Sequence, residues 1–599
     1  MLSALLRCMI VLLAVILPSA CARHAARPDA PAPRAGASGP EKRLPRIDPA
    51  YIQWLERQSM LGMAPQLASQ VSGTEIIWHN SAKAQRLSVL LDAAPNWFYL
   101  NPYATASSQP LFRTLAAQGF ADFLSRTGFN GLFIAPANER GDIWQKPDNA
   151  TGDGENITSL KFDPVLGDDE DFAKLSERME QAQIQMGGNL PPAATGLGPD
   201  FMLQARRAAR FDGIYAMISV PQKNWGLLPR ASDEWECRPL QAETVAALAR
   251  LDLLPESLRR DALPWAAPGG WAATGEVRGS DGRTRRWVYR YSRSVLRPVL
   301  LWQDPSAQAR RIFSAAVIRH TGLQRQTLTG LKLEALMGLD VGEYADEAQS
   351  AGRQELSSLT PGLEALDEVT REIHRYGGWA IQTDALPDHL TPAVLAAGID
   401  VTRDAATPAL VAHALRTRDA GPLHRHLRSS LAAQVDHSRL ARGMGDREDE
   451  DHPSPEARLL ALGWRIGLPG LCFISLEPAA ALSPEKSAAP DILPPLARLL
   501  QSRKQAGLAK GKLLAVLSGP PGCIAAISAL PDGGFWLLAS NFSERERLFS
   551  VALPPGAATG AARDAVNGQL FEGRSFEIAL DARQARHIVF IGQQKGAEQ

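Results

Sequence analysis

The sequence lacks the charge excess and the long apolar runs that mark several protein classes. Lys+Arg and Asp+Glu are equal at 64 each among 599 residues, so the formal net charge is zero. Without a charge excess there is no electrostatic argument for binding nucleic acid or an anionic membrane surface. The apolar run at residues 9–17 is too short to span a bilayer. We therefore expect no nucleic-acid partner.

Cysteine is also scarce, with five in the chain. Beyond the N-terminal region only Cys237, Cys472 and Cys523 are left, which excludes a disulfide framework and allows at most one bridge. Cys472 lies in an apolar run, which predicts a buried thiol. The 11 histidines show no paired metal-ligand spacing, and the acidic run 168–171 fits the start of a helix better than a cation site. We predict no metal site and no cofactor.

The N-terminus has the pattern of an export signal. Arg7 precedes the apolar run, and small residues then lead to Cys21, which predicts a signal peptide over residues 1–21. Those residues resemble a lipobox, whose cysteine is acylated after cleavage, although the leucine stands four residues before Cys21 rather than three. Residues 22–46, rich in Ala, Pro, Arg and Gly, predict a disordered tether. We expect a protein lipid-anchored in the cell envelope, at the periplasmic or outer-membrane side. Because Ala20-x-Ala22 is a competing cleavage site, secretion is the alternative.

From about residue 47, short apolar runs follow segments of helical periodicity. Examples of these runs are 96–100, 131–136, 187–191, 331–336, 379–384, 398–401 and 470–475. Continuous apolar strands that recur after helices indicate a parallel sheet covered by helices. Seven or eight such units over residues 47–505 predict a (β/α)8 barrel. A doubly wound open sheet is the alternative architecture.

Two segments depart from the barrel cadence. A long insertion, at about residues 202–300, contains a basic turn at 282–286 that we predict to be a solvated hairpin tip. Over residues 506–599 the pattern changes to alternating strands, with a turn at Asp532-Gly533-Gly534. This region predicts a C-terminal antiparallel β-sandwich.

Several segments, taken in order, resemble one enzyme family. They are 153–158, 162–164, 195–201, 213–215, 225–229, 285–289, 302–305 and 330–335. Together they resemble the trehalose-synthase-like branch of the α-amylase superfamily, glycoside hydrolase family 13, over about residues 50–595. The resemblance implies a barrel that acts on α-linked glucosides, interconverting maltose and trehalose or hydrolysing related sugars.

The catalytic positions implied by the resemblance are altered. Glu334 falls at the position of the nucleophilic aspartate, and its extra methylene moves the carboxylate by about 1 Å, a displacement that can cost about 10²-fold in rate. Lys332 replaces the orienting arginine and loses the planar bidentate fork. The acid position corresponds to Thr383, whose hydroxyl has no useful pKa for protonating a glycosidic oxygen. Asp384 could substitute only if the strand has ended or bulged, because neighbouring side chains on a strand face opposite ways.

Other positions of the family pattern are altered or open. The third carboxylate corresponds to Glu448, within an acidic run that is typical of a solvated loop. An alanine, Ala194, stands where the family has a histidine. The remaining candidates for substrate contact are Asp153, Asn189, Lys332 and the stacking residues Trp144 and Trp271, although these tryptophans can equally pack the insertion onto the barrel.

These alterations lead us to expect a carbohydrate-associated protein with a degenerate catalytic apparatus, which binds an α-linked glucoside or serves as an envelope scaffold. The alternative is an active retaining α-glucosidase or maltose/trehalose glucosyltransferase with a rearranged site. In that case Glu334 is the nucleophile, and Asp384 or Glu448 is the acid. The sequence does not identify a protein partner.

Overall fold

The computed structural model describes most of the chain from Ile47 onward. The described residues are 47–72, 87–105, 109–140, 156–254, 269–302, 304, 306–333, 336, 360–444, 454–476, 492–553, 562–573 and 575–590. Within these ranges no helix is long and apolar enough to cross a membrane. Cys237, Cys472 and Cys523 form no disulfide, and Cys472 is buried as predicted.

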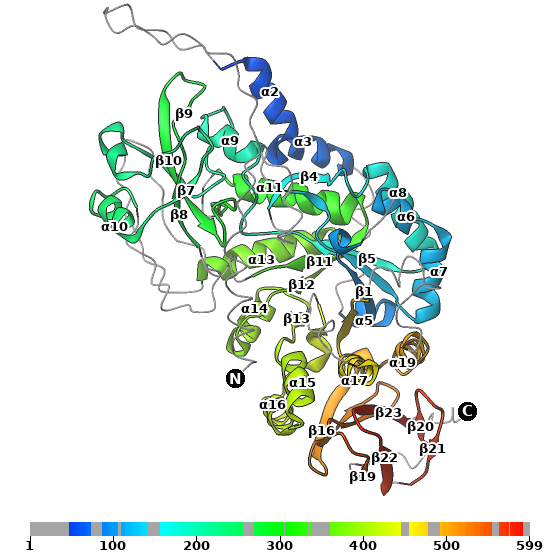
Figure 1. The fold of residues 1–599 in the computed structure, drawn as a ribbon. Coiled ribbons are helices and arrows are strands. Elements are labelled where there is room, and N and C mark those ends of the chain that lie inside the picture. The colour runs from blue at the N-terminus through cyan, green and yellow to red at the C-terminus, as the bar shows by residue number, and fades with distance from the viewer. Residues whose placement is uncertain are drawn as a thin grey trace, which may run out of the picture. The chain divides into compact units, whose positions relative to one another are not determined.

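Eight parallel strands form the central sheet (Figure 1). In spatial order they are β1 (Asn96–Leu100), β2 (Gly131–Ile134), β5 (Gln185–Asn189), β11 (Gln326–Leu331), β12 (Trp379–Gln382), β13 (Thr402–Arg403), β14 (Leu440–Arg442) and β15 (Leu471–Ile474). The sheet closes on itself through the parallel bridge of Ile381 to Val401. The Gln382 N–H also donates to the Val401 carbonyl at 3.0 Å. The predicted (β/α)8 barrel is therefore confirmed, and the open sheet is excluded.

Helices connect the strands and precede the barrel. They are α2 (Pro49–Gln58), α3 (Met60–Val71), α5 (Leu87–Ala93), α6 (Leu111–Leu115), α7 (Gln118–Thr127), α8 (Asp169–Gln181), α11 (Gln308–Val317), α13 (Thr360–Arg375), α14 (Thr391–Ala396), α15 (Ala406–Thr417), α16 (Gly421–Ala432), α17 (Pro455–Ile466) and α19 (Leu493–Gln505). The acidic run begins α8 as predicted, since the Asp168 carboxylate accepts the Asp171 N–H at 2.9 Å. That carboxylate caps the helix and complements its dipole.

Aromatic rings fill the barrel interior. Trp97 stacks on Phe473 with ring centroids 5.9 Å apart, and Tyr99 stacks on Phe133 at 5.9 Å. Glycine makes room for them, because a Cβ at Gly131 would lie 2.3 Å from the Trp97 ring. The interior is thus a packed core, as in other barrels of this type.

The insertion between β5 and β11 forms its own antiparallel sheet. Its strands are β6 (Met217–Val220), β7 (Arg238–Pro239), β8 (Gly269–Ala273), β9 (Val277–Arg278) and β10 (Thr284–Ser292), accompanied by α9 (Pro199–Ala205) and α10 (Ala242–Arg250). The basic turn is the predicted hairpin tip, but it is not wholly solvated. Arg285 and Arg286 are each 7% exposed. Arg285 pairs with Asp281 at 2.7 Å, and Arg286 donates to the Thr274 carbonyl.

The C-terminal region is the predicted antiparallel sandwich. One sheet has the order β16 (Lys512–Ser518), β17 (Cys523–Ala529), β18 (Phe535–Asn541), β23 (Gln584–Phe590), β20 (Ala562–Asp564) and β21 (Leu570–Phe571), and β19 (Arg547–Ala552) pairs with β22 (Ser575–Leu580). Alternate residues such as Ile527, Val551 and Ile578 are fully buried in its core. The His587 ring lies against α17, since a Cβ at Gly463 would be 3.0 Å from its Nε2.

Candidate functional site at the strand tips

The carboxyl ends of the barrel strands form the candidate site. Parallel barrels present catalytic groups at this end, carried by the strand tips and the loops that follow. Several tips have described polar residues, among them Asn189 on β5, Lys332 after β11, Thr383 and Asp384 after β12, and Asp404 after β13. Ladder pairing aligns three of these strands, since Gly330 is opposite Asn189 on one side and Ile381 on the other.

The segment after β11 begins with Lys332 and Leu333. Strand β11 ends at Leu331, so Lys332 is at the tip of the barrel, where it is half-buried. Leu333 is fully buried in the hydrophobic core. The candidate nucleophile Glu334 lies outside the described residues.

Thr383 directly follows β12 and has its hydroxyl engaged. The Thr383 Oγ1 donates to the Leu331 carbonyl at 3.1 Å, and the Thr383 N–H donates to the same oxygen at 2.9 Å. The side chain of Arg403 in turn donates to the Thr383 carbonyl at 3.0 Å. Thr383 therefore ties the tip of β12 to the tip of β11, and its side chain supplies no acid.

Asp384 lies beyond the end of its strand. Because β12 ends at Gln382, strand alternation does not fix the direction of this carboxylate. Its Oδ2 accepts the Leu333 N–H at 2.8 Å, and the residue is 6% exposed. The Gln382 amide donates to the Asp384 carbonyl at 2.8 Å. Asp384 thus fixes the backbone of the residue that precedes Glu334.

Asn189 lies beside Gly330 of β11. A Cβ at Gly330 would lie 2.1 Å from the Asn189 Oδ1 and 2.7 Å from the Thr383 Cγ2. This close approach explains why a glycine stands inside an apolar strand. A glycine at such a position is a signal in the sequence that a neighbouring group approaches the backbone closely. The Asn189 Oδ1 is buried and has no hydrogen-bond partner among the described residues. It is therefore an acceptor at a strand tip that suits a donor such as a sugar hydroxyl.

The structure places the remaining candidates elsewhere or does not describe them. Trp271 is 4% exposed and packs in the core of the inserted sheet, so its indole has no open face for a pyranose. Its assignment as a stacking residue is therefore corrected to a packing role. Met444, beyond the tip of β14, is buried in the barrel core. Glu448, Trp144, Asp153 and Cys21 lie outside the described residues.

The described part of this site offers polar groups that fix the backbone at the strand tips. Across the described ranges, no group of three His, Cys, Asp or Glu side chains could hold a metal ion. Asn189 is on β5, and Thr383 and Asp384 follow β12, so these side chains come from the two strands that flank β11. Hydrogen bonding at a shared strand tip is the chemistry that this arrangement supports.

Comparison with known proteins identifies the fold. No protein-family model matches the sequence, and no curated protein matches it. Among solved structures, α-amylase from Geobacillus thermoleovorans in complex with acarbose has a TM-score of 0.54 and 13% identity, covering 84% of this chain and 99% of that chain. The α-amylase from H. orenii gives 0.56 and 12%, covering 83% and 99%. An α-glucosyl transfer enzyme, XgtA, gives 0.55 and 14%, covering 84% and 99%. The chain has the fold of the α-amylases.

Proposed function

We propose that this protein binds α-linked glucosides at the carboxyl end of its barrel and that its catalytic apparatus is degenerate. The observation that carries the proposal is the state of Thr383, whose hydroxyl donates to the Leu331 carbonyl at the position that the resemblance assigns to the acid. A retaining glycosidase needs two carboxyl groups about 5–5.5 Å apart. Threonine supplies none.

Binding is supported separately from catalysis. The fold is shared with an α-amylase crystallised with acarbose. Asn189 keeps a buried acceptor at the tip of β5, and Lys332 keeps a cation at the tip of β11. A site that hydrogen-bonds sugar hydroxyls needs such donors and acceptors, whether or not an acid stands beside them.

The second candidate is an active enzyme with a rearranged site, in which Glu334 is the nucleophile and Asp384 or Glu448 the acid. The end of β12 at Gln382 favours this candidate, because it removes the alternation argument against Asp384. The buried hydrogen bond from the Leu333 N–H to Asp384 weighs against it, since this carboxylate is already engaged by the backbone.

The two candidates are separated by incubating the signal-free protein with maltose, trehalose and maltooligosaccharides and following products by NMR. The degenerate reading predicts no product, together with saturable sugar binding by calorimetry. Loss of binding in Asn189→Ala, with an unchanged circular dichroism spectrum, would support the tip site. A product that disappears in Glu334→Gln would establish the enzyme instead. Folded protein with neither product nor binding would leave only a scaffold role.

We also propose that Cys21 is acylated and holds the protein in the cell envelope, with secretion as the alternative. The support is the order of charged, apolar and small residues over 1–21. Metabolic labelling with a tagged fatty acid should mark the wild type and leave Cys21→Ser unlabelled. Label retained by Cys21→Ser, or absent from both, would contradict acylation at this residue.

A further inference from the structure

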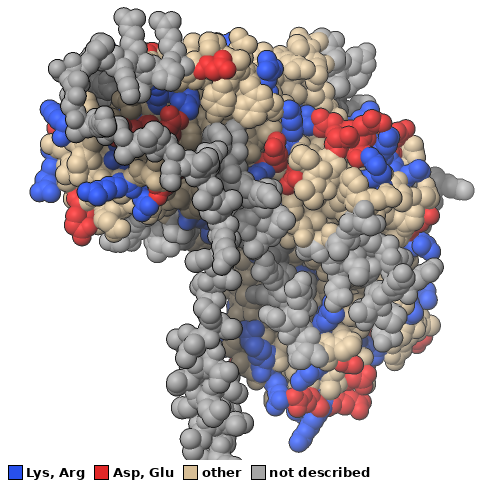
Figure 2. All heavy atoms as spheres, turned by 45° about the horizontal axis from the view of Figure 1, so that its top comes forward, with Lys and Arg blue, Asp and Glu red and all other residues tan. Residues whose placement is uncertain are grey.

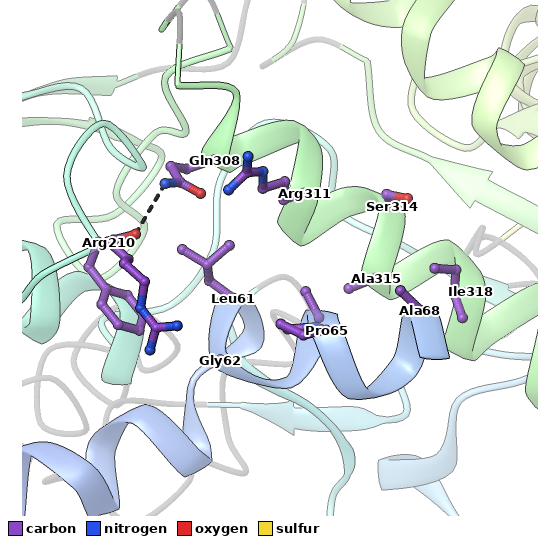
Figure 3. A pocket seen from close by; sticks show the side chains of 12 residues that line it. Leu61, Gly62, Pro65, Ala68, Arg210, Gln308, Arg311, Ser314, Ala315 and Ile318 are labelled. Atoms are coloured by element: carbon purple, nitrogen blue, oxygen red, sulfur yellow. Dashed lines mark hydrogen bonds between the residues drawn. The ribbon is translucent and has the colours of Figure 1, made fainter. Parts of the chain in front are cut away.

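A groove of about 360 Å³ lies between α3 and α11, and none of its lining residues belongs to a barrel strand or a strand tip (Figure 3). Small residues create it, since α3 presents Gly62, Ala64 and Ala68, and α11 presents Ala315. The floor is apolar and includes Leu61 and Ile318, which are 9% and 5% exposed. Its size is within the range of about 300–1,000 Å³ that is usual for small-molecule sites.

One end of the groove is basic and polar. Arg210, from the loop after α9, and Arg311, on α11, both line this end and are both exposed. Neither guanidinium has an ion-pair or hydrogen-bond partner among the residues that the structure describes. None of the 12 lining residues is acidic. Two unpaired cations beside an apolar floor are complementary to a ligand with one anionic head and an apolar chain.

A buried amide at this end is also incompletely satisfied. Gln308 is 7% exposed, and its Nε2 donates to the Arg210 carbonyl at 3.1 Å. Its Oε1 is buried and has no hydrogen-bond partner within the described part of the chain. Because an amide oxygen only accepts hydrogen bonds, this atom adds polarity to that end of the groove without itself binding an anion, and the two arginines are the groups that can donate to one.

We propose that this groove binds a medium-chain fatty acid, with the carboxylate between Arg210 and Arg311 and the chain along α3 and α11. Arginine pairs suit a carboxylate because the guanidinium donates in a planar fork. Pro65 and Ala68 on α3 and Ala315 on α11 give the chain an apolar path past the point where the two helices pack. The site is independent of the strand tips and of sugar binding.

The test is calorimetric titration of the signal-free protein with decanoate below its micelle concentration. We expect saturable one-site binding, and binding about tenfold weaker for decanol, which lacks the charge, and for acetate, which lacks the chain. Arg311→Gln should weaken decanoate about tenfold. The matched control is Arg310→Gln, because Arg310 is the neighbouring exposed arginine and pairs with Glu368 at 2.7 Å outside the groove.

A second pair of variants tests the chain end. Ala68→Trp fills the floor from an exposed position and should abolish binding, whereas Ser69→Trp on the adjacent exposed position should not. Equal affinity for decanol and decanoate, or an unchanged Arg311→Gln, would overturn the proposal. The proposal would also be overturned if light scattering showed a dimer that Ala68→Trp dissociates. The groove would then be occupied by a second copy of the chain.

Discussion

Asp384 and Asp404 follow neighbouring barrel strands, and both are nearly buried, at 6% and 7% exposed. Their partners differ. Asp384 accepts the backbone N–H of Leu333, which is 51 residues away and lies just beyond the tip of the adjacent strand β11. Asp404 pairs with the Arg442 guanidinium at 2.9 Å and accepts the Thr407 N–H at 2.9 Å. One carboxylate therefore positions a loop, and the other neutralises a buried charge.

The comparison teaches that the role of a buried carboxylate depends on the groups that face it. Burial alone would raise the pKa of Asp404, but the attraction of Arg442 and the Thr407 hydrogen bonds outweigh it and hold that pKa below its usual value. Arg442 is fully buried, and it also donates to the Pro469 carbonyl and contacts the His437 ring. Position after a strand tip thus does not by itself make a carboxylate catalytic. Among the described residues of the face drawn in Figure 2, basic and acidic side chains are interspersed, with no single sign prevailing.

Removal of Asp404 has the largest expected effect on stability. Asp404→Ala leaves Arg442 buried without its counter-charge, which costs about 3–5 kcal/mol in the free energy of unfolding. Urea denaturation followed by circular dichroism measures the loss. The control is Asp367→Ala, which breaks an exposed pair with Arg371 and should change the stability by about 0.5 kcal/mol or less. Similar losses in the two variants would contradict the distinction between buried and exposed pairs. If Asp404→Ala does not fold, Asp404→Asn gives the same ranking.

Acid should weaken the contact between α17 and β23. Burial lowers the pKa of His587 to about 4, below the value of about 6.5 in an unfolded chain. The unfolded state then binds more protons than the folded state between these pH values, so stability is full above pH 6.5 and falls as the pH drops toward 4. This histidine accounts for on the order of 2 kcal/mol of that fall.

His587→Leu should flatten the pH dependence, and denaturation series at several pH values between 4 and 8 measure it. The exposed His389→Leu serves as the control and should keep the wild-type slope. Burial, followed by Arg442, also lowers the pKa of His437 to about 4, so some acid sensitivity persists in His587→Leu. An identical slope in wild type and His587→Leu would show that other groups cause the difference in proton binding between the folded and unfolded states.

The architecture was predictable from the sequence because several barrel strands, such as β1, β2 and β15, are apolar runs that follow helical segments. The start of α8 was predictable too, since three acidic residues after Asp168 suit a helix N-terminus. The strand pairing that closes the barrel was not predictable. It depends on a single bridge from Ile381 to Val401, and β13 has only two residues.

The site was less predictable, because its contacts join residues far apart in the chain. The alternation rule argued against Asp384, yet β12 ends two residues earlier and the carboxylate turns to Leu333. The prediction that the basic turn is solvated was wrong in part for a similar reason. Arg285 and Arg286 look solvated in a charged run, but Asp281 and the Thr274 carbonyl bind them within the hairpin. Composition gives charge, whereas hydrogen-bond partners are a property of the fold.

Two variants of Asp384 sharpen the comparison with Asp404. Asp384→Ala leaves the buried Leu333 N–H without an acceptor, which should cost about 1–3 kcal/mol and weaken sugar binding by loosening the segment before Glu334. Asp384→Asn keeps a carbonyl oxygen and should recover most of both losses. Denaturation and sugar titration are measured in parallel. An acid role predicts the same recovery of stability and binding in Asp384→Asn, but with the loss of any turnover.

Thr383→Val should have the smallest effect of the tip substitutions. It removes the hydroxyl that donates to the Leu331 carbonyl, but the Thr383 N–H donates to the same oxygen at 2.9 Å, so no acceptor is left unsatisfied. The expected loss is about 1 kcal/mol or less, because valine also keeps the branched shape beside Gly330. Sugar affinity should stay the same, since this hydroxyl already has a partner within the protein. A marked loss of sugar affinity with unchanged stability would mean that the hydroxyl hydrogen-bonds the ligand. Thr383 would then be a binding residue rather than a residue that joins the tips of β11 and β12.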